Sequence, residues 1–251
     1  MAGLLLILVI AGLWWPVYRA THRRFTYVLV HGAYGGGWGF RQLDAIMTDD
    51  GQKVFRPTLT GQGERMHLNG PDVNLNTHIQ DVVNMIEFED LHDVVLVGHS
   101  YGGMVITGVA DRIPERIKCV IYLDAALPED GETEETAANG ALRPRTKDKT
   151  DANGSIVPVW FDRKLPLPHD EPEPAGAFST PISLNNQAVA RAIPTTYMLY
   201  VPDGKRPSDA RFYPFYLRAI DRHWKTATMF SGHNAQWLHP RELAAFLESA
   251  P

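Results

Sequence analysis

An uninterrupted apolar run that leads into a glycine-flanked serine is the feature that most constrains this chain. Val94–Val97 is followed by Gly98-His99-Ser100-Tyr101-Gly102, and helical spacing continues to about Ile113. A continuous apolar run predicts a strand in the middle of a parallel sheet, where both faces are covered. The G-x-S-x-G pattern between a strand and a helix predicts a sharp turn that projects the serine hydroxyl at the carboxyl end of the strand. The sequence therefore predicts an α/β architecture with Ser100 at its functional edge.

Strand and helix patterns alternate along most of the chain. A length of 251 residues suits one α/β domain, and the alternation predicts a doubly wound, mostly parallel sheet. The expected strands are 25–30, 53–57, 93–98, 117–123, 195–201 and 225–230. The expected helices are 38–50, 77–89, 101–113 and one that begins at Pro240, with Thr77 and Gln80 as a capping box for the second.

The alternation stops between residues 128 and 193. This stretch contains many of the chain's 18 prolines, and a structureless loop of that length is unusual inside a compact domain. We therefore expect a cap inserted at about 128–193, over the functional edge of the sheet, within a domain that spans 25–251.

A nucleophilic serine needs a base, because its hydroxyl is nearly unreactive at neutral pH. His233 follows the last expected strand and precedes the last helix, which is where the base lies in hydrolases with the chain order Ser, acid, His. His239, its nearest competitor, falls at the start of the final helix. The sequence predicts His233 as the general base.

Two aspartates compete for the third position, which orients the imidazole and stabilises its positive charge. Asp203 follows the strand 195–201 and precedes His233 by a length that fits one helix and one strand. Asp124 ends the strand 117–123. We favour Asp203 and keep Asp124 as the alternative.

An oxyanion hole requires two backbone N–H groups aimed at the developing negative charge. Tyr101, the residue after the nucleophile, is expected to supply one, and Ala33 in the glycine-rich loop 31–37 the other. A glycine-rich loop can also bind the phosphates of a nucleotide. In such sites the loop is followed by Gly-Lys-Ser/Thr, or a G-x-G-x-x-G motif opens a helix, and this loop has neither feature. A nucleotide site is therefore disfavoured.

The charge and the cysteine content limit the classes of molecule that this chain is expected to bind. The net charge is −5 and the pI about 6.0, so no basic field is available for a nucleic acid. Cys119 is the single cysteine, which excludes an intramolecular disulfide or a cysteine-based metal site. We expect a small-molecule substrate, with no nucleic-acid partner and no metal.

The first 24 residues form a hydrophobic extension ahead of the domain. Residues 3–18 are almost wholly apolar, and Arg19, Arg23 and Arg24 follow. The run is short for a membrane span, which needs about 20 residues. Basic residues on the C-terminal side of the run favour a cytoplasmic location for the domain that follows. A weak membrane anchor and a passive extension both fit this pattern.

The residues quoted above resemble a known family. Several segments are similar to the plant methyl salicylate esterase and hydroxynitrile lyase group and its bacterial relatives. They are Tyr27–Ala33 with Gly36-Gly37-Trp38, the strand and serine turn at 93–103, Tyr200–Asp203 and Gly232-His233. The resemblance spans 25–246 except the cap. It implies the α/β-hydrolase fold and a cofactor-free serine esterase, with Ser100, Asp203 and His233 as the triad.

The chain departs from the lyases of that group. They carry a threonine where this chain has Gly32 and a lysine near the catalytic histidine, which this chain lacks. The resemblance thus favours cleavage of a carboxylic ester of a small or medium hydrophobic alcohol or acid, through an acyl-enzyme. The alternatives are a non-catalytic small-molecule binder and a lyase on the same fold. Aromatic residues expected to line an apolar substrate pocket are Tyr34, Trp38, Trp160, Phe161 and Trp237.

Overall fold

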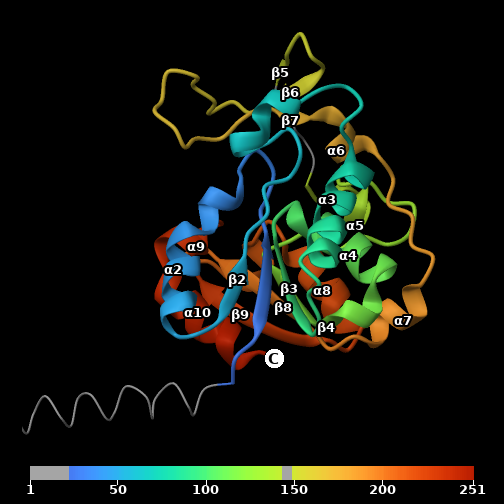
Figure 1. Ribbon diagram of the computed structural model, residues 1–251, viewed down its shortest axis with the longest axis vertical. Helices are drawn as coiled ribbons and strands as arrows, with labels where there is room; N and C mark the ends of the chain where they lie inside the picture. Colours follow the sequence, from blue (N-terminus) through green and yellow to red (C-terminus); the bar gives the residue numbers. More distant parts are fainter. Residues whose placement is uncertain (1–22, 143–148) are drawn as a thin grey trace, which may run out of the picture.

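A six-stranded parallel sheet with the order β2-β1-β3-β4-β8-β9 forms the centre of the molecule (Figure 1). The computed structural model describes residues 23–142 and 149–251. The strands of this sheet are β1 (Thr26–Val30), β2 (Lys53–Phe55), β3 (Val94–His99), β4 (Ile117–Leu123), β8 (Thr195–Val201) and β9 (Lys225–Phe230). The predicted fold class is confirmed, and the strands expected at 117–123, 195–201 and 225–230 have the expected bounds.

Helices cover both faces of the sheet, and each face has its own core (Figure 1). Because side chains alternate along a strand, Val95 and Val97 belong to one core while Val94 and Leu96 belong to the other. The first core lies beneath α2 (Arg41–Asp49) and α10 (Pro240–Ser249). The second lies beneath α3 (Leu75–Phe88), α4 (Gly102–Arg112) and α8 (Tyr213–Asp221). Short elements complete the domain: η1 (Gly37–Phe40), η2 (Gly63–Leu68), η3 (Pro114–Arg116), η4 (Pro207–Asp209) and α9 (Ala235–Leu238).

The start of α3 and its capping box differ from the sequence prediction. The helix expected at Thr77 begins at Leu75 in the structure, because Asn74 is its N-cap. The Asn74 side chain accepts the N–H of Thr77 at 3.3 Å, and Thr77 Oγ1 accepts the N–H of Asn74 at the same distance. The capping box is therefore Asn74 with Thr77 rather than Thr77 with Gln80.

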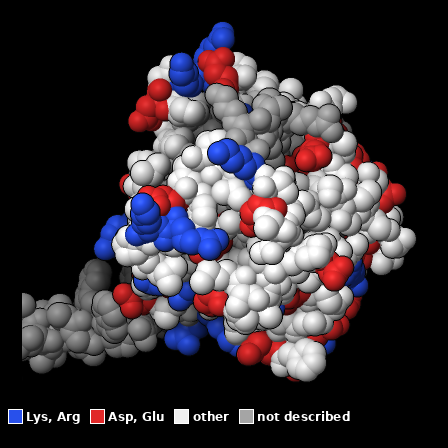
Figure 2. Space-filling view, turned by 90° about the horizontal axis from the view of Figure 1, so that it is seen from above, with Lys and Arg blue, Asp and Glu red and all other residues white. Residues whose placement is uncertain are grey.

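Residues 128–142 and 149–193, which we call the cap segment, carry elements of their own. A small sheet and the helix 175–179 lie above the carboxyl ends of the strands, whereas the helix 187–192 lies lower, beside α4 (Figure 1). The small sheet is antiparallel and has the order β5-β6-β7. Seen from that end, the described surface is mostly uncharged, with acidic and basic side chains scattered over it (Figure 2). The elements are α5 (Ala137–Gly140), β5 (Lys149–Thr150), β6 (Ser155–Val157), β7 (Glu173–Pro174), α6 (Ala175–Ser179) and α7 (Gln187–Ala192).

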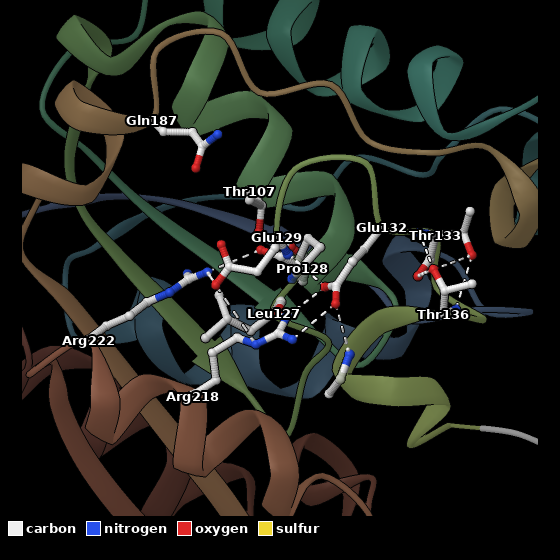
Figure 3. A network of polar contacts seen from close by, with 12 residues as sticks. Thr107, Leu127, Pro128, Glu129, Glu132, Thr133, Thr136, Gln187, Arg218 and Arg222 are labelled. Carbon is white, nitrogen blue, oxygen red and sulfur yellow. Dashed lines mark hydrogen bonds and ion pairs between the residues drawn. The ribbon is translucent and has the colours of Figure 1, made fainter.

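A network of ion pairs fixes the start of the cap segment to α8 (Figure 3). Arg218 donates from Nη1 to Leu127 O and to Glu132 Oε2, both at 2.6 Å. Arg222 donates from Nη2 to Glu129 Oε1 at 2.6 Å. The chain is thereby held just after β4, a few residues beyond Asp124.

Loss of the Arg218 guanidinium is expected to destabilise the fold. Its side chain and that of Glu132 are about one fifth exposed, so Arg218→Met leaves a partly buried carboxylate and a carbonyl without their donor. We expect the free energy of unfolding to fall by about 2 kcal/mol, measured by urea denaturation. Arg206→Met is the control, because the Arg206 side chain, which pairs with Asp209, is 81% exposed. An equal loss in both variants would contradict the role of this network.

The predicted anchor at residues 3–18 lies outside the described residues. Within the part of the chain that the structure describes, no helix has the length and apolar character needed to cross a bilayer.

Candidate active site

The turn between β3 and α4 presents Ser100 with a left-handed backbone, φ 55°. The turn is held on both sides: the Ser100 N–H donates to Leu123 O at 3.3 Å, and Ser100 O accepts the N–H of Ala126 at 2.9 Å. The glycine at position 103 is required by close packing, because a Cβ there would lie 2.0 Å from Ala126 O. The predicted strand–serine–helix turn is thus present, with its serine braced against the residues that follow β4.

His233 reaches Ser100 from the loop after β9. The Ser100 hydroxyl lies 2.9 Å from His233 Nε2. On the other side of the ring, His233 Nδ1 lies 2.6 Å from Asp124 Oδ2. An ionised carboxylate only accepts hydrogen bonds, so Nδ1 carries the proton and Nε2 is left to accept the hydroxyl of Ser100.

The carboxylate that contacts His233 is that of Asp124, the alternative from the sequence, and Asp203, which the sequence favoured, is not brought to the ring. Asp124 follows β4, is 5% exposed and accepts the N–H of Tyr200 through Oδ1 at 3.2 Å. Asp203 is exposed in a turn after β8. Both residues follow parallel strands and so reach the same edge of the sheet. Asp124, however, takes a left-handed φ of 44° that turns its carboxylate under the imidazole.

Two rings enclose the imidazole of His233. Phe212 stacks on one side, with ring centroids 5.0 Å apart and an interplanar angle of 8°. The ring of His99 lies 4.6 Å away, and its Nε2 donates to His233 O at 2.8 Å. In the sequence, His99 is the residue before Ser100, and no pattern singles out Phe212, which precedes α8 by one residue.

His31 fixes the path of the glycine-rich loop 31–37, which we call the oxyanion loop after its predicted role. Leu59 N–H donates to His31 Nε2 at 3.1 Å, so the ring proton is on Nδ1, which donates to Gly32 O at 2.7 Å. The carbonyl of Gly32 and the N–H of Ala33 belong to one planar peptide group and point in opposite directions. Holding the carbonyl therefore aims the Ala33 N–H, which donates to no atom in the described part of the chain.

Gly32 must lack a side chain, because it lies directly against the nucleophile. A Cβ at this position would be 2.9 Å from the Ser100 Cβ and 3.2 Å from His99 Nδ1. The threonine that the related lyases carry at this position would therefore clash with Ser100 in this structure.

Three buried histidines brace this region in the neutral form. Burial lowers the pKa of His31 and of His78 to about 4, and burial together with the neighbouring His233 lowers the pKa of His99 well below its usual value. His78 donates from Nε2 to Thr60 O and accepts the hydroxyl of Tyr101 at Nδ1, both at 2.9 Å. The side chain of Tyr101, the predicted second oxyanion donor, is thereby tied to α3.

These histidines are expected to make the fold acid-sensitive. Their folded pKa lies below the unfolded value of 6.5, so the unfolded chain takes up protons first as the pH falls. Their stabilisation is complete above about pH 6.5. It is lost towards pH 4 at about 1.4 kcal/mol per pH unit for each histidine. The free energy of unfolding, measured by urea denaturation at several pH values across this range, should fall less steeply with falling pH in His78→Gln than in the parent protein, by that amount. An equal pH dependence in the two proteins would contradict the assignment.

A cavity of about 160 Å³ opens over Ser100 between the oxyanion loop, the cap segment and the loop of His233. Trp38 and Trp237 stack at 5.7 Å, and the Trp237 indole N–H donates to Gly39 O at 2.7 Å. Phe161, expected in this lining, packs against His169 and does not reach the cavity. Of the predicted substrate-contacting residues, the cavity is lined by Tyr34, Trp38, Trp160 and Trp237, and further walls come from Leu142, Asp170, Arg211 and Phe212.

Comparison with known proteins agrees with this architecture. A family model described as the alpha/beta hydrolase family matches residues 27–246. The chain belongs to this family. A carbendazim hydrolyzing esterase of Nocardioides sp. (strain SG-4G) is 38% identical over 239 residues, covering 87% of this chain and 96% of that protein. The predicted enzyme class, a carboxylic ester hydrolase, is confirmed by this likeness to an esterase.

The plant relatives match a shorter stretch. A putative chloroplastic methylesterase 11 of Arabidopsis thaliana is 30% identical over 109 residues, covering 43% of this chain and 28% of that protein. An extracellular alpha/beta-hydrolase from a Paenibacillus species superposes with a TM-score of 0.70 at 22% identity, covering 90% of this chain and 98% of that structure. The predicted resemblance to plant esterases and their bacterial relatives is confirmed.

Proposed function

We propose that this α/β-hydrolase cleaves a carboxylic ester through an acyl-enzyme on Ser100. The observation that carries the proposal is the continuous chain of hydrogen bonds from Ser100 Oγ through the His233 ring to Asp124, with distances of 2.9 and 2.6 Å. This is the arrangement that activates a serine hydroxyl.

In the first half-reaction, Ser100 Oγ attacks the ester carbonyl carbon while its proton passes to His233 Nε2. The carbonyl oxygen becomes an oxyanion, which the N–H groups of Ala33 and Tyr101 stabilise. Asp124 stabilises the imidazolium. The C–O bond to the alcohol then breaks, and the alcohol oxygen takes the proton from His233.

In the second half-reaction, His233 Nε2 takes a proton from a water molecule whose oxygen attacks the acyl carbon. The same two N–H groups hold the second oxyanion. Collapse of this intermediate breaks the bond to Ser100 Oγ and returns the proton to it, which releases the carboxylic acid and restores the free enzyme.

The substrate is proposed to be a small or medium ester with an aromatic or other apolar group. The cavity is modest in volume, and Tyr34, Trp38, Trp160 and Trp237 contribute aromatic walls. A relative that hydrolyses carbendazim, and others that are methylesterases, support a compact substrate of this kind.

Two alternatives on the same fold are less well supported. A non-catalytic binder does not need the alignment of Ser100, His233 and Asp124, which this chain retains. A cyanohydrin lyase of the related group uses a threonine and a lysine that are lacking here, since Gly32 has no space for a side chain and Asn234-Ala235-Gln236-Trp237 follow His233.

Labelling with an organophosphate separates catalysis from binding. Reaction with diethyl p-nitrophenyl phosphate should add one diethylphosphoryl group, located on Ser100 by peptide mass spectrometry, with release of one equivalent of p-nitrophenol. Asp203→Asn is the control and should label like the parent protein. A protein that stays unlabelled and binds esters without hydrolysing them would support the binder. Rates for p-nitrophenyl esters of increasing acyl length then measure the size limit of the cavity.

A further inference from the structure

Ala33 lies between two peptide groups, and a different side chain holds each. His31 holds the peptide before it, through the carbonyl of Gly32. The peptide after it carries the N–H of Tyr34, which donates to Glu173 Oε2 at 2.6 Å. Because a peptide group is planar, fixing one of its polar atoms fixes its orientation. The first peptide carries the Ala33 N–H and the second fixes the chain directly after it, so Ala33 is anchored on both sides.

The second anchor comes from the cap segment. Glu173 lies in β7, is fully buried and is separated from Tyr34 by 139 positions in the sequence. The same short stretch makes a second contact with this residue, because the Glu171 N–H donates to Tyr34 O at 2.7 Å. Both polar backbone atoms of Tyr34 thus bond to the cap segment.

The stretch that carries Glu173 is itself docked on the core domain. Pro172 O accepts from Gln62 Nε2 at 3.1 Å and from Asn69 Nδ2 at 2.9 Å. The carboxylate of Glu173 is therefore held at a defined place relative to the sheet.

Tyr34 needs such support, because its φ of 68° is left-handed. A bulky residue in this region is strained and persists only where its surroundings hold it. Without the Glu173 carboxylate, the peptide between Ala33 and Tyr34 loses its side-chain anchor. Ala33 is then fixed only through the peptide before it, so its Cα and its N–H can shift within the loop.

We propose that Glu173 is a positioning residue through which the cap segment holds the oxyanion loop in its working conformation. This inference rests on the proposed function, in which the Ala33 N–H stabilises the oxyanion. The cap segment then contributes to the chemical step as well as to the walls of the cavity.

Glu173→Ala tests the proposal through kcat. Removal of an oxyanion donor costs about a hundredfold to a thousandfold in kcat. A misdirected donor should cost about tenfold to a hundredfold, with KM changed less than threefold. A trifluoromethyl ketone, whose adduct with Ser100 carries an oxyanion, should bind more weakly by the same factor as kcat/KM falls. The corresponding methyl ketone, used as a weak non-adduct ligand, should bind as before. Glu173→Gln, which keeps an acceptor oxygen, should recover most of the kcat.

Asp111→Ala is the matched control for lost stability. Asp111 is 2% exposed and accepts two cap-segment N–H groups, from Asn185 and Asn186, both at 2.8 Å, away from the oxyanion loop. It should be destabilised like Glu173→Ala while keeping its kcat. A folded Glu173→Ala protein with parental kcat would overturn the inference, as would an equal loss of kcat in Asp111→Ala or equal weakening of both ketones. Ser100→Ala, measured in parallel, tests the proposed function separately, because activity retained there would overturn the mechanism itself.

Discussion

Ser100→Ala should lower the turnover of a p-nitrophenyl ester by about a million-fold, the loss found when a triad nucleophile is removed. No other side chain takes its place, because His233 Nε2 faces only the Ser100 hydroxyl among the described residues. The fold should persist, since Ser100 is bonded to its neighbours through its backbone. Steady-state rates and a thermal unfolding curve for the purified variant provide the measurement.

The control for this variant is its reaction with the organophosphate. Ser100→Ala should remain unlabelled under conditions that label the parent protein completely. A variant that keeps more than a few per cent of the parental rate with an intact fold would show that another group attacks the ester, and the assignment of the nucleophile would then be wrong.

The second large effect is expected at Asp124. Asp124→Asn should lower kcat by about ten-thousandfold, because an amide that faces Nδ1 favours the imidazole tautomer with its proton on Nε2, where it cannot accept from Ser100. KM should change little, since the carboxylate is buried behind the ring. Initial rates over a range of ester concentrations separate the two constants.

Asp203→Asn is the matched variant, with the same chemical change at an exposed turn. It should retain the parental kcat. If Asp203→Asn loses activity while Asp124→Asn does not, then the acid that works in catalysis differs from the one that contacts His233 in the structure.

The serine turn and the histidine that contacts it could be located from the sequence because each has a local signature. Ser100 follows an apolar strand and opens a helix, and His233 follows the last strand of the sheet. Both signatures depend on residues within a few positions along the chain. For the same reason, the central strands were predicted nearly residue by residue, whereas the short elements of the cap segment were not.

The acid could not be chosen in this way, because two aspartates share one signature. Asp124 and Asp203 each follow a parallel strand, and the family resemblance favoured the second. The flanking residues carry a weak signal that separates the two. Asp203 lies between Pro202 and Gly204, as in an exposed turn, whereas Asp124 precedes Ala125-Ala126-Leu127, which are buried.

The contacts that steady the site were beyond sequence reasoning. Phe212 on His233 and Glu173 on Tyr34 join segments with no shared pattern, and the second pair is 139 positions apart. Such pairings depend on how the cap segment and α8 pack on the sheet, which a single sequence does not encode in any local motif.

The left-handed backbone at Ser100 has a consequence for engineering. A glycine accepts φ 55° without the steric penalty that a side chain meets, so Ser100→Gly would relieve strain at the one position where the hydroxyl is indispensable. A selection for heat resistance alone would thus favour an inert protein. Directed evolution of this chain for higher thermal stability must therefore also select for catalytic activity in every round, because at this turn stability and activity favour different residues.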